Sequence, residues 1–142
     1  MHVYPITIHQ DDDPGVWADS PLVPEFFTAG DDVADLLDHH AQDGMVSALS
    51  IYQDQGRAIP VPDGRLAGTH GVALSVLQTA KVGLWNVMCD QGVSRAELGR
   101  RLGISAAMAG RLVDVLHGSR MDSVERALSV LGQRVGLTIE AA

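Results

Sequence analysis

Cysteine and aromatic residues are scarce in this 142-residue sequence, which has one cysteine, two phenylalanines, two tyrosines and two tryptophans. Because Cys89 has no second cysteine to pair with, intrachain disulfides are excluded. No apolar run approaches the roughly 20 residues that a membrane-spanning helix needs. The first residues also lack the basic start and apolar core of a secretory signal. We therefore expect a cytoplasmic protein without disulfides.

Basic residues are also scarce, but only in the first half of the chain. Residues 1–75 hold twelve acidic residues and two basic ones, a net charge of −10. Residues 76–142 hold six acidic and eight basic residues, a net charge of +2. Such asymmetry favours two domains with different partners, a basic protein for the first and nucleic acid for the second. We place the boundary between residues 77 and 78, and expect oligomerisation because domains of about 70 residues are marginally stable by themselves.

The first domain, residues 1–77, shows the hydrophobic patterns of an α+β fold. Residues 3–9 alternate in hydrophobicity, as a half-buried strand does. An acidic turn that ends with Pro14 and Gly15 leads to a second short strand. A helical stripe of apolar residues then predicts one helix packed on a small antiparallel sheet. The predicted strands are 3–9, 16–19, 26–29 and 72–77, and the predicted helix covers about 31–53.

The second domain, residues 78–142, has the 3.6-residue period of helices from Thr79 onward. We predict an all-α domain with helices over about 79–91, 94–102, 106–116 and from 122. At its end, Val135, Leu137 and Ile139 alternate with other residues, which predicts a short terminal strand. A lone strand needs a partner, so these three residues are candidates for self-association with a second copy of the chain.

Two of these helices have the layout of a helix-turn-helix DNA-binding unit. Ser94 and Glu97 form a capping-box pattern at the start of the first helix. Gly103 can end that helix in the left-handed conformation, and Ser105 can cap the second helix. Small Gly99 lies where the second helix must approach closely. In such units the second helix can enter the major groove of DNA.

The candidate DNA-contacting residues follow from this layout. Arg111 lies on the predicted recognition helix beside small residues that permit close approach to DNA. Arginines contact phosphates and base edges, although a solvated helix face is the alternative interpretation. The small net charge of this half predicts salt-sensitive binding, with specificity from two half-sites about 34 Å apart that a dimer contacts. The candidates are Arg100, Arg101, Ser105, Ala106, Ala107, Gly110 and Arg111.

Several segments, in their order and spacing, resemble the HicB-type antitoxins of bacterial toxin–antitoxin pairs, in the subclass with a helix-turn-helix C-terminus. The resemblance covers nearly the whole chain. In the first half it rests on segments such as Tyr4-Pro5-Ile6-Thr7-Ile8 and Thr28-Ala29-Gly30-Asp31. It continues through Ala80-Lys81-Val82 to Arg95-Ala96-Glu97-Leu98-Gly99-Arg100-Arg101-Leu102-Gly103-Ile104 and Glu125-Arg126-Ala127-Leu128. One departure is Pro21-Leu22-Val23-Pro24-Glu25, where the family often has Asp at the second position.

The resemblance implies a degenerate ribonuclease H-like first domain that binds and blocks a small basic toxin of the HicA type, which cleaves mRNA. It also implies that the second domain, as a dimer or tetramer, represses its own operon by binding palindromic operator DNA. On this basis we expect no enzymatic activity and no cofactor. Charged loops can steer association, and a tryptophan can anchor an interface, although core packing is its default role. The toxin-binding candidates are Asp11, Asp12, Asp13, Trp17 and Glu25.

Three other functions stay open on the sequence. A stand-alone transcription regulator would use its first domain to sense a ligand or to oligomerise, and an antitoxin-like protein could have a different partner. A metal-dependent nuclease would use the carboxylates of residues 11–13 in two-metal chemistry. However, adjacent carboxylates point in different directions, and a solvated turn is the simpler interpretation. Because His39 and His40 point about 100° apart on a helix, we expect no metal site.

Overall fold

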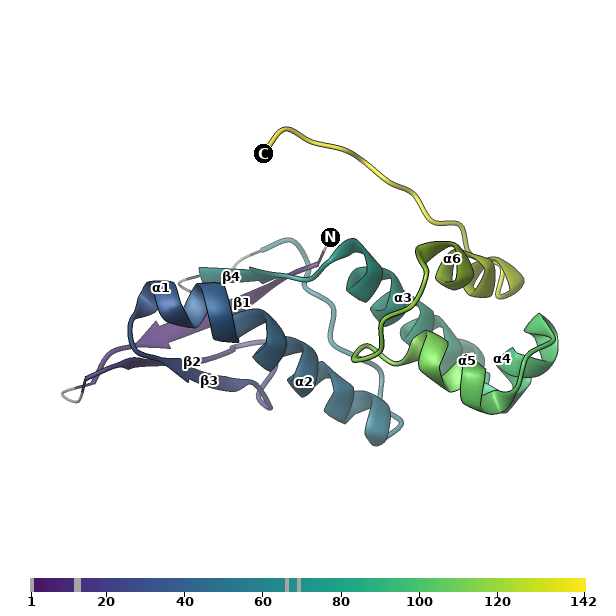
Figure 1. Cartoon of the computed structure of the whole chain (residues 1–142), viewed down its shortest axis with the longest axis horizontal. Coiled ribbons are helices and arrows are strands. Elements are labelled where there is room, and N and C mark those ends of the chain that lie inside the picture. The colour runs from purple at the N-terminus through teal and green to yellow at the C-terminus, as the bar shows by residue number, and fades with distance from the viewer. Residues whose placement is uncertain (1, 12–13, 66, 69) are drawn as a thin grey trace.

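A computed structural model describes residues 2–11, 14–65, 67–68 and 70–142 of the chain. Its first part is a four-stranded antiparallel sheet in the order β3-β2-β1-β4, with a helical segment packed against it (Figure 1). The predicted α+β class is confirmed. The strands are β1 (Val3–His9), β2 (Val16–Asp19), β3 (Phe27–Gly30) and β4 (His70–Ala73). The helical segment consists of α1 (Val33–Asp35), the π-helical turn η1 (Leu36–His40) and α2 (Ala41–Asp54).

The central strand β1 explains how this half builds its core. Successive side chains of a strand point to opposite faces, so Tyr4 and Ile6 are buried on the face that α2 covers. The first part of β1 pairs with β4 and its last part pairs with β2. Gly44 lets α2 lie close to the sheet, because a Cβ there would be 3.3 Å from the Phe26 ring and 3.4 Å from Thr28. The absence of a side chain at Gly44 therefore allows the apolar residues of α2 to pack directly against the sheet.

The second part is a group of helices that follows β4 directly (Figure 1). The predicted strand over 72–77 is too long at its end, since β4 stops at Ala73. The reason is a capping box, in which Ser75 accepts from the Gln78 backbone and the Gln78 side chain accepts from the Ser75 backbone. Of the helices within the described ranges, none is long and apolar enough to cross a membrane. The helices are α3 (Val76–Gln91), α4 (Arg95–Leu102), α5 (Ala106–Val113) and α6 (Met121–Val130).

The last ten residues do not form the predicted terminal strand within one chain, so its pairing with a second copy stays a prediction. Residues 133–142 have no regular secondary structure, and the tail runs from α6 back in the direction of the sheet while standing apart from it in the view of Figure 1. The physical reason is pairing, because a strand is formed only when another strand satisfies its backbone groups. Among the residues that the structure describes, the strands are those of the one sheet, and the tail pairs with none of them. Leu137 is 70 % exposed and Ile139 is 89 % exposed.

The two halves are in direct contact through α3. The Trp85 indole donates to the Arg57 carbonyl over 2.7 Å. The Asn86 amide makes two bonds to the Ile59 backbone, of 2.8 and 2.9 Å. Buried apolar residues of both halves belong to one continuous cluster. The middle of α3 therefore fixes the loop after α2, and its end leads into the remaining helices.

Candidate functional site

The helix-turn-helix geometry is present in α4 and α5. Gly103 ends α4 with a left-handed φ of 71°, and Ser105 caps α5 by accepting from the Met108 backbone over 3.1 Å. Ser94 caps α4 by accepting from the Glu97 backbone over 3.1 Å. The Glu97 side chain does not complete the predicted capping box, because it binds two arginines instead. Gly99 lies at the close approach, since a Cβ there would be 2.7 Å from the Ile104 carbonyl oxygen.

α5, the predicted recognition helix, presents small residues and Arg111 on one side, with the Arg95 side chain of α4 lying 3.4 Å from where a Cβ on Gly110 would be. Ala106, Ala107 and Arg111 are exposed and Gly110 is half-buried. The sequence analysis missed Met108, which is 52 % exposed on the same helix. Met108 lies three residues before Arg111 and is not among the buried residues of α5, which are Ala109, Leu112 and Val113. This spacing places it beside Arg111 on the helix surface. Such a methionine can contact a thymine methyl group while the arginine contacts a phosphate or a guanine edge.

Arg100 and Arg101 lie on α4 rather than on the recognition helix, and both bind Glu97. Arg100 makes bonds of 2.8 and 2.6 Å to the Glu97 carboxylate, and Arg101 makes one of 2.9 Å. These bonds lower the pKa of Glu97 to about 2. The shared carboxylate orders both guanidinium groups on the surface of α4. Phosphates would have to compete with Glu97 for them.

The sheet face opposite α2 carries a row of stacked rings. His9 pairs with Trp17 across β1 and β2, and their ring centroids are 4.0 Å apart. The Trp17 and Phe27 centroids are 5.9 Å apart, and Phe27 is 66 % exposed. We call His9, Trp17 and Phe27 the aromatic ladder. Trp17 is therefore outside the core, and the sequence analysis missed His9 and Phe27, which alternation places on the same face.

Carboxylates border the aromatic ladder. The Trp17 indole donates to Asp11 over 2.8 Å, and the His9 ring lies 2.8 Å from Asp19. Asp11 is thus ordered beside the ladder, whereas the candidates Asp12 and Asp13 lie outside the described residues. Asp19 is a further carboxylate that the sequence analysis did not select. An aromatic surface with carboxylates at its edge can bind a guanidinium or ammonium group by stacking and ion pairing.

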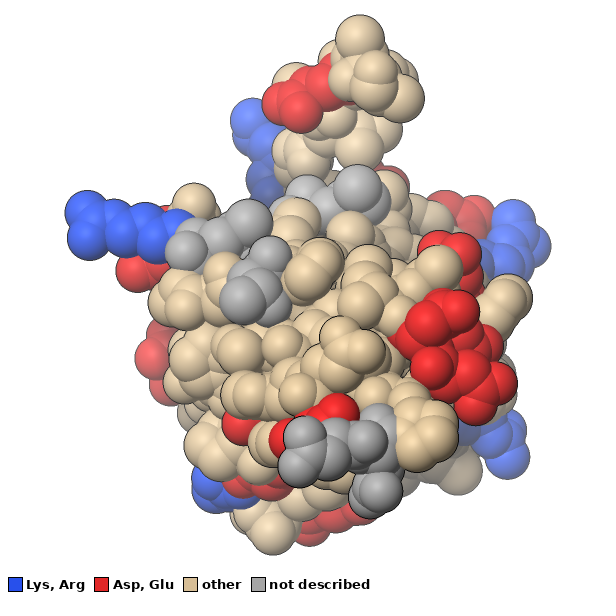
Figure 2. All heavy atoms as spheres, turned by 90° about the vertical axis from the view of Figure 1, so that its left-hand side faces the viewer, with Lys and Arg blue, Asp and Glu red and all other residues tan. Residues whose placement is uncertain are grey.

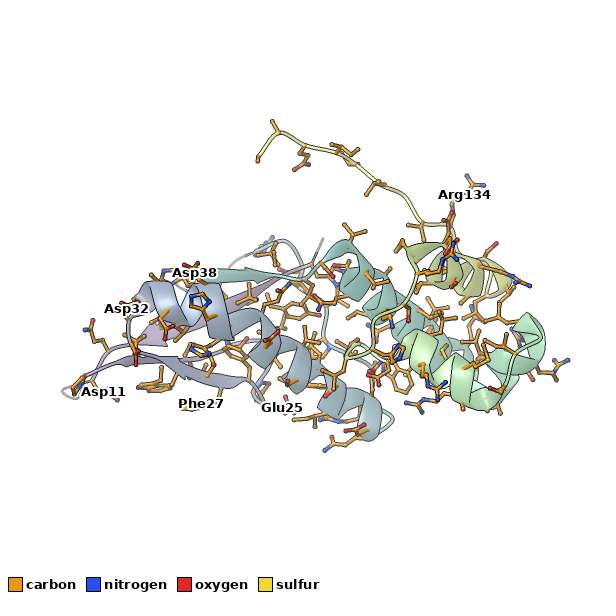
Figure 3. All side chains as sticks on the ribbon, viewed as in Figure 1. Asp11, Glu25, Phe27, Asp32, Asp38 and Arg134 are labelled. Atoms are coloured by element: carbon orange, nitrogen blue, oxygen red, sulfur yellow. The ribbon has the colours of Figure 1, made fainter. Side chains whose placement is uncertain are left out.

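More acidic residues gather at the same end of the molecule. Figure 2 shows carboxylates concentrated on one side of this end, while Lys and Arg lie towards its outline. Figure 3 places Asp11, Asp32 and Asp38 at this end, far from Arg134. Asp32 caps α1 by accepting from the Asp35 backbone over 2.8 Å. A bond from the Asp31 backbone lowers the pKa of the Asp35 carboxyl, so the charge here is held on ordered groups.

Glu25, the remaining toxin-binding candidate, has its partners inside the chain. Its carboxylate accepts a short hydrogen bond from the Tyr52 hydroxyl and forms an ion pair with Arg57 at 3.1 Å. Arg57 also lies over the Tyr52 ring, 4.2 Å from its centroid. The Tyr52 bond is the main reason that the pKa of Glu25 is lowered. Glu25 thus ties the loop before β3 to the end of α2 and the residues that follow it, and Figure 3 shows it apart from Asp11.

The described residues hold no group of three His, Cys, Asp or Glu side chains that could bind a metal ion. His39 and His40 have ring centroids 6.5 Å apart and nearly perpendicular planes. His40 instead lies 3.3 Å from the Asp35 carboxylate. These geometries suit surface ion pairs.

The self-association candidates differ in exposure. Val135 is half-buried and packs against the core, whereas Leu137 and Ile139 extend into solvent. The tail borders a groove of about 990 Å³. Its floor is formed by apolar residues of α3 and α6, such as Val87 and Leu128.

Comparison with known proteins agrees with these features. A family model described as the HicB-like antitoxin of bacterial toxin–antitoxin systems matches residues 3–83. The chain is 46 % identical over 144 residues to antitoxin HicB of Pseudomonas fluorescens, covering 100 % of this chain and 97 % of the relative. It is 29 % identical to antitoxin HicB 1 of Photorhabdus laumondii, covering 96 % of this chain and 86 % of the relative. It is 26 % identical to antitoxin HicB of Escherichia coli K12, covering 96 % of this chain and 98 % of the relative. The chain therefore belongs to the HicB-like antitoxin family of bacterial toxin–antitoxin systems.

Proposed function

We propose that this antitoxin binds and neutralises a small basic toxin with its first half and represses its own operon with its second half. The observation that carries the proposal is the separation of two unlike surfaces. An acidic, aromatic surface lies on the sheet, and a helix-turn-helix unit lies at the other end of the chain (Figure 1). The proposed domains are residues 1–77 and 78–142. Because its partners would be an mRNA-cleaving toxin and operon DNA, the proposed site of action is the cytoplasm.

Neutralisation in this proposal is steric and electrostatic, and needs no catalysis and no cofactor. A toxin of the HicA type that cleaves mRNA needs basic groups to hold the phosphate backbone. Asp11 and Asp19 beside the aromatic ladder offer such groups carboxylates and ring faces. The net charge of −10 in residues 1–75 would speed encounter at low salt. A toxin held on this face could not bind its RNA substrate.

Repression in this proposal uses α5 in the major groove. Ser105 and Ala106 start the helix, Ala107 and Arg111 are exposed along it, and Gly110 is half-buried beside the Arg95 side chain. Small side chains let the helix backbone approach the bases, and Arg111 supplies the direct contact. Arg100 and Arg101 would reach flanking phosphates from α4.

Binding to a palindromic operator requires at least two copies of the chain. We propose that the tail supplies the contact, with Leu137 and Ile139 of one copy placed on a second copy. The apolar groove on α3 and α6 beside each tail offers a matching surface. The tail would pair with its symmetry mate as a strand in the dimer or tetramer.

The test is co-expression of the tagged full chain with the product of the adjacent short reading frame. The proposal predicts a stoichiometric complex with a basic protein of fewer than about 100 residues. In this complex the basic protein should no longer cleave mRNA. Fluorescence anisotropy with a duplex from upstream of the operon should show binding that weakens steeply with salt. Operator binding without any toxin partner would instead favour a stand-alone transcription regulator.

A further inference from the structure

The recognition helix ends differently from its neighbours. α3 and α4 end at Gly92 and Gly103, whose left-handed backbone lets the next N–H groups satisfy the last carbonyls. α5 instead ends at Asp114, which has extended backbone with φ −63° and ψ 117°. Several carbonyl groups at and beyond this end therefore need partners from elsewhere in the chain. Two side chains from outside the helix-turn-helix unit supply them.

The first of these side chains is Lys81 of α3, which is fully buried. Its ammonium lies 3.1 Å from the Arg111 carbonyl oxygen and 3.0 Å from that of Asp114. It also donates to the His117 carbonyl over 2.5 Å and to the Ser119 hydroxyl over 2.8 Å. A cation among carbonyl oxygens at the C-terminal end of a helix is favoured by the helix dipole. Lys81 thereby holds the whole turn from α5 towards α6.

The second side chain is Gln53 of α2, which belongs to the first half of the chain. Its amide donates to the Val113 carbonyl over 2.9 Å, and its oxygen accepts from the Val115 backbone over 3.1 Å. Gln53 is 4 % exposed, so water does not compete for these bonds. Among the described residues, the buried polar side chains are Ser20, Gln53 and Lys81. Two of these three act on the same segment, 111–119.

We infer that Gln53 and Lys81 are positioning residues for operator recognition, although neither lies on the helix-turn-helix unit. They fix the end of α5 to α2 and α3, and so set the direction in which α5 projects towards DNA. Figure 1 shows the loop after α5 turning back towards these two helices before α6 begins. An eight-residue helix has little stability of its own and takes its orientation from what it packs against. The inference rests on the proposed binding of DNA by α5.

The consequence concerns specific binding. Arg111 lies two residues from the anchored end of α5, and Ala107 lies about one turn further back. A tilt of α5 would move both relative to the bases, whereas non-specific attraction to phosphates depends chiefly on total charge. Loss of either anchor should therefore lower operator affinity more than affinity for unrelated DNA.

The test compares Gln53→Leu with Gln91→Leu in the full chain. Gln91 is the control, an exposed side chain whose amide donates over 2.9 Å to the Leu131 carbonyl at the end of α6 and makes no bond to residues 111–119 that the structure describes. Anisotropy would be measured with an operator duplex and with a random duplex of equal length. We expect Gln53→Leu to weaken operator binding about tenfold or more, and random binding less than about twofold. Gln91→Leu should change neither by more than about twofold, even if both variants lower the melting temperature.

Lys81→Met is a second, independent variant, and we expect it to lose the same amount of operator affinity as Gln53→Leu. If Gln53→Leu does not fold, as judged by its melting curve, Gln53→Met carries the test. That variant keeps the length and flexibility of the side chain but loses the bonds to Val113 and Val115 without burying a charge. Equal operator affinity for the wild type, Lys81→Met and either Gln53 variant would overturn the inference. A wild-type chain that does not bind the operator would instead overturn the proposed function.

Discussion

At the scale of single residues, Glu97 shows how the helix-turn-helix surface is held in order. It lies between Arg100 and Arg101, and their hydrogen bonds bring its pKa to about 2, below the ordinary value of 4.5. A carboxyl whose pKa is lower in the folded chain than in the unfolded chain stabilises the fold above the unfolded value. That contribution is lost as the pH falls from about 4.5 towards 2.

The replacement Glu97→Gln should therefore flatten the acid limb of the stability profile. Between pH 5 and pH 2.5 the wild type should lose more free energy of unfolding than the variant, because only the wild type must protonate this carboxylate. Urea unfolding at constant low salt measures both slopes. Parallel losses in the two proteins would show that the ion pairs on α4 do not stabilise the fold.

Glu25 gives a second prediction at this scale. Tyr52→Phe removes the hydroxyl that donates to Glu25 and keeps the ring under Arg57. A hydrogen bond to a charged group stabilises by about 2 kcal/mol, so the free energy of unfolding should fall by about that amount. Ser50→Ala is the control on the same helix, since Ser50 donates only to the nearby Ser47 carbonyl. A Tyr52→Phe variant as stable as Ser50→Ala would contradict the role assigned to Glu25.

The sequence could select Asp11 and Arg111 as surface residues, because turn composition and helix faces are local properties, but for Trp17 it favoured packing in the core. The sequence could not show that Glu25 is bound inside the chain while Asp11 lies at the aromatic ladder, since Tyr52 and Arg57 contact Glu25 from about 30 positions away. In the same way, alternation places Phe27 on a face but does not show whether that face is covered. Long-range contacts therefore decide which candidates remain available to a partner.

At the scale of secondary-structure elements, the packing of α4 against the turn before α5 leaves no room at Gly99. A Cβ there would lie 2.7 Å from the Ile104 carbonyl oxygen and 3.0 Å from that of Ser105. Gly99→Ala should therefore destabilise the chain by about 1–3 kcal/mol, because backbone atoms must move. Gly83→Ala in α3 is the matched control, where nothing lies within 4 Å of the added atom.

The Gly83→Ala variant should be as stable as the wild type or more stable by up to about 1 kcal/mol, since alanine favours the helix. Thermal or urea unfolding of the two variants side by side measures the difference. A Gly99→Ala chain that matches Gly83→Ala in stability would mean that α4 and the turn do not pack as closely as described.

Element types were predictable from the sequence, and the predicted ends were wrong where a cap decided them. Ser75 caps α3, which begins at Val76, three residues before the change of hydrophobic period becomes visible at Thr79. α5 stops at Val113, before the predicted end at Leu116, because Lys81 and Gln53 hold the following backbone. The alternation in the tail predicts a strand, but a strand also needs a neighbour, and periodicity does not reveal one.

At the scale of the whole molecule, the proposed self-association depends on the tail, residues 133–142. Removing residues 134–142 should lower the oligomeric state of the wild type to a monomer, because the exposed apolar pair of the tail would be lost. Sedimentation equilibrium of both proteins at the same concentration measures the masses. The double variant Leu137→Ser, Ile139→Ser should give the same result without shortening the chain. Unchanged masses would assign self-association to another surface.

The central claim is that one end of the chain binds the toxin and the other binds the operator. It is tested most directly by measuring both affinities for Trp17→Ala and Arg111→Ala. Trp17→Ala should weaken toxin binding about tenfold or more with operator affinity unchanged, because it removes the middle of the aromatic ladder. Arg111→Ala should weaken operator binding by a similar factor with toxin affinity unchanged. If either variant weakened both interactions equally, or neither, the assignment of the two functions to separate surfaces would be contradicted.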